Sequence, residues 1–133
     1  RAIEAAYDCS ELLIGAFSNM EALSKKCMST DGRIVVLCAG WNNRVNLEDT
    51  LFCGAFVEQV GLITDVEPGS DAVNMVLGLW SAAKKNSLEF VKDSEHYHRL
   101  QVHGVEEDAA YCLKTNTLSI VPFLDKTSNL LRI

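Results

Sequence analysis

The stretch CAGWNNRVNLEDTLFCG, residues 38–54, gathers many of the side chains in this sequence that could do chemistry. A thiol at Cys38 and a guanidinium at Arg44 are separated by five residues, and the carboxylates of Glu48 and Asp49 follow. Arginine attracts phosphate and other oxyanions, whereas carboxylates repel an oxyanion unless a cation lies between them. The stretch therefore predicts an anion-binding loop beside an acidic pair.

The local pattern supports two further interpretations. The C-x5-R spacing of Cys38 and Arg44 is that of phosphatases that use a cysteine thiolate of low pKa and hold phosphate against a backbone loop. However, bulky Trp41 stands where such a loop needs small residues. A plain structural interpretation is a buried cysteine at a strand end, followed by a helix that Asn46 caps and whose first turn is acidic. The residues alone leave these interpretations open.

Composition and charge exclude several classes of protein. The chain has 133 residues, of which 48% are hydrophobic and 23% charged, so it is expected to form one ordinary globular domain. A net charge of -6 argues against a nucleic-acid or anionic membrane surface as partner. No apolar run reaches the roughly 18 residues of a membrane span. Five cysteines without CxxC spacing predict neither a disulfide framework nor a zinc ribbon, and they favour the reducing cytoplasm.

The apolar pattern alternates between strand and helix along the chain. Predicted strands, rich in apolar and β-branched residues, are 11–17, 33–38 and 117–124, the last containing Pro122. Predicted helices are 1–6, 18–29, 47–62, 70–87 and two short ones between 95 and 114, with turns at 30–32 and 65–70. The pattern predicts an α/β domain with helices layered around a mainly parallel sheet, ending in a β-hairpin whose second strand is 129–133.

The loop 38–46 lies where such folds bind ligands. In open α/β sheets, ligands bind beyond the carboxyl ends of the strands, where loops lead into helices. Unpaired backbone N–H groups at the start of the predicted helix from Leu47 suit an anion. A module that binds phosphate or sulfate there without hydrolysing anything is therefore a further alternative.

Residues 38–56, CAGWNNRVNLEDTLFCGAF, are similar to the pattern of the 2-phosphosulfolactate phosphatases, the ComB-like proteins. That pattern has a strand ending in CAG, then T-N-G-R, an aromatic residue, and S-L-E-D before a helix with a glycine. The segments RAIEAA, GAFSN and GVEEDAAYCLKTNTLSIVPFL also resemble the family, so the resemblance spans nearly the whole chain. The chain departs from the pattern at Trp41, Asn43 and Asn46, where the family has Thr, Gly and Ser.

The resemblance implies a magnesium-dependent phosphatase that converts 2-phosphosulfolactate, a small anionic phosphate ester, to sulfolactate and phosphate on the way to coenzyme M. Mg²⁺ would let carboxylates face a phosphate productively. The implied metal ligands, which are also implied catalytic residues, are Glu48 and Asp49, and Asp108 matches a further family acid. The implied substrate contacts are the Gly40 backbone, Asn42 and Arg44.

Family members are nearly twice as long as this chain. The resemblance therefore implies that residues 1–133 are the carboxyl-terminal part of a longer two-part protein, and that part of the active site lies elsewhere. We expect an exposed apolar face where the other half packs. Homo-oligomerisation through that face is an expected consequence.

Overall fold

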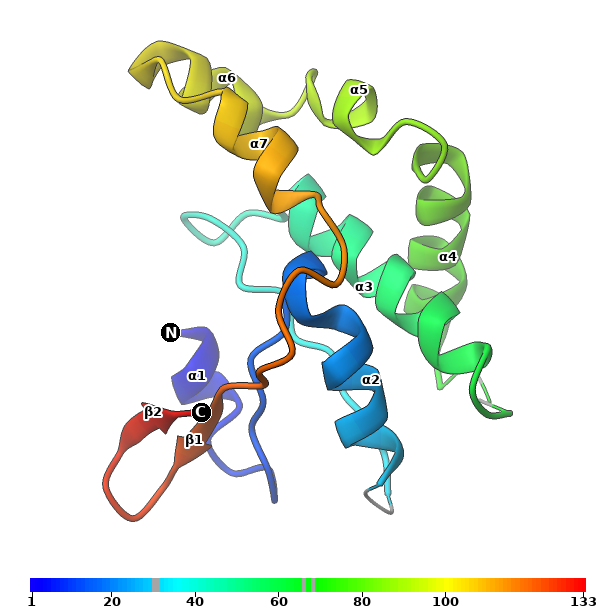
Figure 1. Ribbon diagram of the computed structural model, residues 1–133, viewed down its shortest axis with the longest axis vertical. Coiled ribbons are helices and arrows are strands. Elements are labelled where there is room, and N and C mark those ends of the chain that lie inside the picture. Colours follow the sequence, from blue (N-terminus) through cyan, green and yellow to red (C-terminus); the bar gives the residue numbers. More distant parts are fainter. Residues whose placement is uncertain (30–31, 66, 68) are drawn as a thin grey trace.

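The computed structural model describes residues 1–29, 32–65, 67 and 69–133. The predicted turns at 30–32 and 65–70 include Thr30, Asp31, Val66 and Pro68, which lie outside the described residues. In chain order the elements are α1 (Ala2–Ala5), the 3₁₀ helix η1 (Phe17–Asn19), α2 (Met20–Met28), α3 (Leu47–Gly61), α4 (Asp71–Ala83), α5 (Ser87–Val91), α6 (Glu95–His103), α7 (Glu107–Cys112), β1 (Phe123–Asp125) and β2 (Leu130–Arg132) (Figure 1). None of the described helices is both long and apolar enough to cross a membrane.

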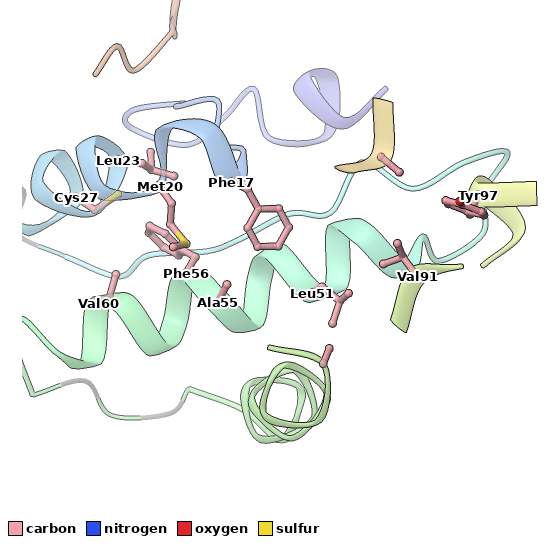
Figure 2. Packing of buried hydrophobic residues seen from close by; sticks show 12 residues of the cluster. Phe17, Met20, Leu23, Cys27, Leu51, Ala55, Phe56, Val60, Val91 and Tyr97 are labelled. Carbon is pink, nitrogen blue, oxygen red and sulfur yellow. The ribbon is translucent and has the colours of Figure 1, made fainter. Parts of the chain in front are cut away.

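Helix α3 lies at the centre of the packing, between α2 and α4 (Figure 1). Its apolar residues form two stripes, and the buried members include Leu51, Ala55, Phe56 and Val60. Phe17 comes in from the α2 side to meet α3, as Figure 2 shows. The predicted helix over 47–62 is confirmed, because two-sided burial favours the same conformation as the local pattern.

The contact between α3 and α4 depends on a glycine. A Cβ added at Gly54 would lie 2.2 Å from the Val76 carbonyl oxygen and 2.7 Å from Trp80 Cβ. Next to this close approach, Glu58 of α3 accepts hydrogen bonds from Trp80 Nε1 at 2.9 Å and from Lys84 Nζ at 2.6 Å. The two helices are therefore held together by close backbone packing at Gly54 and by the hydrogen bonds of Glu58 to Trp80 and Lys84 beside it.

Local sequence signals also predicted the helices in the carboxyl-terminal half of this chain. The predicted pair of short helices between 95 and 114 is confirmed as α6 and α7, and Gly104 separates them with φ +66°. The predicted helix over 70–87 ends earlier, at Ala83, and α5 then begins after Asn86, whose side chain accepts from Glu89 N.

The sheet is smaller than the sequence predicts. Within the described residues it consists of β1 and β2, paired antiparallel with Leu124 opposite Leu131, so the C-terminal hairpin is confirmed. Asp125 accepts hydrogen bonds from Ser128 and Arg132 across its turn, which lowers the pKa of Asp125 to about 2. The structure is thus a mixture of helices and a small sheet, compatible with an α/β fold, and it does not contain the predicted parallel sheet among the residues described.

The predicted strands 11–17 and 33–38 are not strands here, and of the predicted strand 117–124 only Phe123 and Leu124 lie in β1. Residues 11–17 run antiparallel to 117–124 with few hydrogen bonds, such as Ile14 N to Pro122 O at 2.8 Å and Leu124 N to Leu12 O at 3.0 Å. Residues 33–38 have no strand neighbour within the described part of the chain. Strand formation needs a hydrogen-bonded neighbour, so β propensity alone leaves these segments without ladder pairing.

We predict opposite effects for two helix glycines. Gly54→Ala should lower the free energy of unfolding by about 1–3 kcal/mol, because the added methyl group overpacks the contact with α4. Gly78→Ala should raise it by about 0.5–1 kcal/mol, because Gly78 lies inside α4 with nothing within 4 Å of an added Cβ. Urea unfolding followed by circular dichroism measures both. Shifts of the same sign would contradict the packing described.

Candidate functional site

The loop before α3 is a tight turn. Trp41 N donates to Arg44 O at 3.0 Å, and Arg44 N donates to Trp41 O at 2.8 Å. The two central residues, Asn42 and Asn43, have φ of 49° and 62°. Two positive φ values in a two-residue turn define type I′, for which asparagine is well suited. The predicted substrate contact Asn42 therefore stands exposed at the tip of the turn.

Gly40 fastens this turn to α3. Its φ is +66°, and an added Cβ would lie 2.6 Å from Arg44 O. Its N–H donates to Asp49 Oδ2 at 2.7 Å. The N–H that we expected to bind substrate thus has the predicted metal ligand Asp49 as its acceptor, and this hydrogen bond places the turn against the first turn of the helix.

Glu48 points to a different neighbour. Its Oε1 accepts from the Ser94 hydroxyl at 2.8 Å, and Ser94 Oγ in turn accepts from Tyr97 N at 3.0 Å as the cap of α6. Glu48 Oε2 is buried and has no hydrogen-bond partner in the described structure. Because a buried carboxylate oxygen is costly without a partner, this atom can accept a cation or a donor from outside the chain described.

A cavity of about 240 Å³ lies beside these residues, between the turn, the start of α3 and the start of α6. It is lined by Trp41, Arg44, Val45, Asn46, Leu47, Ser94, Glu95 and Arg99. Arg44 Nη1 lies 3.2 Å from Glu95 Oε1, an ion pair whose side chains are both 71% exposed. Such an exposed pair is weak, so Arg44 can exchange Glu95 for another anion.

Arg99 is a candidate that sequence reasoning missed. Its guanidinium lies 5.0 Å from the centre of the Trp41 ring, and its Nη2 lies 3.1 Å from His96 Nδ1. No carboxylate of the described residues forms an ion pair with it. Positions 41 and 99 are far apart in sequence, so no spacing rule could have linked them.

The predicted site residues thus divide by position. Arg44 lines the cavity. Glu48 does not line it but accepts a hydrogen bond from Ser94, which does. Asp49 accepts a hydrogen bond from Gly40 N at the base of the turn. Asp108 is exposed in α7 and is not one of the described residues that line the cavity. The structure brings the first three together around the start of α3 and leaves Asp108 on another element.

Two thiols pack behind the turn. A hydrogen bond with Cys53, burial and the nearby charge of Asp49 raise the pKa of Cys38 above its ordinary value. The same hydrogen bond lowers the pKa of Cys53 to about 7. The first proton therefore leaves Cys53, because its thiolate accepts the hydrogen bond from the Cys38 thiol.

This geometry weighs against the thiolate interpretation of Cys38 and Arg44. A thiol with a raised pKa is a poor nucleophile near neutral pH. The backbone N–H groups of Gly40, Trp41 and Arg44, which would have to cradle a phosphate, are already donated to acceptors in the chain.

The residues fit a magnesium ion only in part. Within the described ranges no three or more His, Cys, Asp or Glu side chains are grouped so that they could hold a metal. Mg²⁺, however, commonly uses one or two protein carboxylates and takes its other ligands from water and substrate. The unpartnered Oε2 of Glu48 suits one such ligand, whereas one oxygen of Asp49 is committed to Gly40.

A loop with an exposed arginine beside an acidic helix start is a candidate site for an oxyanion. The family model described as 2-phosphosulpholactate phosphatase matches residues 1–127, and the chain belongs to this family. Proteins named probable 2-phosphosulfolactate phosphatase are similar to it. They include one from Caldanaerobacter subterraneus subsp. tengcongensis, 27% identical over 93% of this chain and 51% of its own length.

Two other relatives of the same name come from Clostridium tetani and Nostoc punctiforme. The first is 29% identical over 92% of this chain and 51% of its own length. The second is 27% identical over 96% of this chain and 54% of its own length. The chain therefore spans about half the length of the curated relatives it matches.

We predict that the thiol pair has an asymmetric reactivity. Alkylation of Cys53 by iodoacetamide should rise with a midpoint near pH 7, in line with its lowered pKa of about 7. Cys38→Ala removes the donated hydrogen bond and should move this midpoint upward, toward the ordinary thiol value of about 8.5. Mass spectrometry of the labelled peptides measures both rates, with exposed Cys112 as the reference for reagent access. Faster labelling of Cys38 than of Cys53 at pH 7 would contradict the assignment.

Proposed function

We propose that this chain forms one half of a phosphatase that hydrolyses 2-phosphosulfolactate to sulfolactate and phosphate. The family match over residues 1–127 is the observation that carries the proposal. The relatives named probable 2-phosphosulfolactate phosphatase agree with it. In the reaction, water attacks phosphorus, the ester bond between phosphorus and the C2 oxygen breaks, and that oxygen leaves on sulfolactate with a proton.

The charges around the cavity support a substrate of this kind. The substrate carries a phosphate, a sulfonate and a carboxylate, so it needs several cationic contacts. Arg44 and Arg99 supply two guanidinium groups at one cavity, against the single carboxylate of Glu95. A guanidinium can bind a tetrahedral oxyanion with paired hydrogen bonds. We assign Arg44 and Arg99 to binding of the substrate's anionic groups.

Magnesium belongs to this proposal as a cofactor that Glu48 would hold through Oε2. Bound Mg²⁺ would neutralise phosphate charge and activate the attacking water. Ser94 orients the other oxygen of Glu48 by its hydrogen bond, and Asp49 keeps the turn with Arg44 against the helix. The acidic pair would then have divided roles, one residue binding metal and the other positioning an arginine.

The other half of the protein would supply what this chain lacks. We propose that it adds strands that complete a mainly parallel sheet, together with further residues of the active site. Five cysteines, all free, are consistent with the reducing cytoplasm, which is the compartment we propose.

The activity test measures phosphate release from 2-phosphosulfolactate. The proteins are the chain itself and a covalent fusion of the chain to the half of the Caldanaerobacter relative that it does not match. We expect the fusion to release phosphate with Mg²⁺, to stop in EDTA, and to recover in excess Mg²⁺. Glu48→Gln in the fusion should lower kcat by about 100-fold, whereas Glu107→Gln, on exposed α7, should leave it unchanged.

Each alternative has its own outcome in this assay. Release that resists EDTA and disappears in Cys38→Ser would favour the thiolate mechanism. Phosphate binding without release from any preparation would favour a non-catalytic anion-binding module. Either result would overturn the proposed magnesium-dependent hydrolysis.

The assigned role of Arg99 predicts a separate effect. Arg99→Ala should raise KM by about 10-fold to 100-fold with little change in kcat, because one charge-assisted contact to the substrate is lost. The KM of Arg99→Lys should lie between those of the unmodified protein and Arg99→Ala, because lysine keeps the positive charge but lacks the planar fork of donors. Lys85→Ala, an exposed cation outside the cavity, is the control. A fall in kcat with unchanged KM would contradict the binding role.

A further inference from the structure

We propose, resting on the two-part phosphatase proposed above, that residues 33–38 are a docking strand, which pairs through its backbone with a strand from the other half of that protein. The segment is RIVVLC, rich in β-branched residues, and it follows the described end of α2 and precedes the Gly40 turn. The docking site is thus directly connected to the candidate functional site.

The two faces of the segment differ as in a strand that is covered on one side. Val36 packs against the hydrophobic core, and Cys38 contacts Cys53 of α3. Val35 and Leu37, at the alternate positions, are 72% and 50% exposed, and Ile34, on the same side as Val36, is 44% exposed. Alternation with period two is the strand pattern. A strand of this composition in a parallel sheet is normally covered on both faces.

The backbone of the segment also lacks hydrogen-bond partners within the described chain. Among the described residues, no hydrogen bond joins the backbone N–H or C=O groups of residues 33–39 to another group. Segments 11–17 and 117–124, by contrast, share two such bonds, Ile14 N to Pro122 O and Leu124 N to Leu12 O. An apolar segment with free backbone groups is a template for strand addition. We therefore expect a polypeptide strand to pair with this segment, because an apolar surface alone would leave its backbone groups without partners.

The lengths of the relatives identify the occupant. The chain covers 51% of the length of the Caldanaerobacter and Clostridium tetani relatives, so each contains as much polypeptide again that has no counterpart here. That length is ample for the missing strands and for helices that would cover Val35 and Leu37. A second copy of this chain would offer the same bare strand and no additional one, and it would bring together two chains of charge -6.

The test mixes the 133-residue chain with the unmatched half of the Caldanaerobacter relative, and separately with that of the Nostoc punctiforme relative. Isothermal titration calorimetry measures binding, and amide hydrogen exchange maps it. We expect a complex with at least one half, with exchange slowed at residues 33–38. Val35→Asp and Leu37→Asp should each raise Kd at least about 30-fold, since they place a charge in an apolar contact.

Val102→Asp is the matched control, because Val102 is 83% exposed on α6, away from the segment. It should leave Kd unchanged, and circular dichroism should show that all three variants are folded. Binding to neither half, protection that avoids residues 33–38, or a homodimer that Val35→Asp dissociates would each overturn the proposal. Calorimetry and hydrogen exchange do not depend on catalysis, so failure of the docking proposal can be distinguished from failure of the proposed phosphatase activity.

Discussion

The burial of α3 on two sides is the constraint on which the rest of the structure depends. Helices α2 and α4 cover its two apolar stripes, and the Gly54 contact brings α4 against its backbone. A helix held in this way presents its first turn in a fixed orientation. Asp49 can then accept from Gly40 and fix the turn that carries Arg44, while Glu48 reaches Ser94 at the start of α6. The cavity forms between elements that the core has already placed.

Local signals predicted the helices and the final hairpin well, because those elements satisfy their hydrogen bonds within the segment or across a short turn. Gly104 marked the break between α6 and α7, and Asn43 tolerated a left-handed turn. The parallel sheet was not predictable from this chain alone, because a strand such as 33–38 needs a neighbour that its own sequence does not name. Arg99 escaped for a related reason, since only the fold brings it over Trp41.

The two adjacent carboxylates Glu48 and Asp49 make different contacts in the fold. One oxygen of Asp49 accepts the hydrogen bond from Gly40 N. The charge of Asp49 also raises the pKa of Cys38, although the hydrogen bond to Cys53 and burial raise it more. Glu48, one residue earlier, hydrogen-bonds to Ser94 instead and retains a buried oxygen without a hydrogen-bond partner. A helix places successive residues about 100° apart, so neighbours in sequence face different surroundings. The sequence showed two carboxylates, and the fold separated their roles.

Two features of the described chain lack hydrogen-bond partners within it: the buried Oε2 of Glu48 and the backbone of residues 33–38. A buried carboxylate oxygen without a partner costs about 1–3 kcal/mol, and free backbone groups on an apolar segment carry a similar penalty for every group that is shielded from water. Glu48 Oε2 has no hydrogen-bond partner in the described structure, and no hydrogen bond joins the backbone groups of residues 33–38 to another described group. An ion or substrate group would give the carboxylate oxygen a partner, and a strand that shielded residues 33–38 from water would also pair their backbone groups. Since the segment leads through Cys38 into the Gly40 turn, a strand that orders it would also order the loop that carries Arg44.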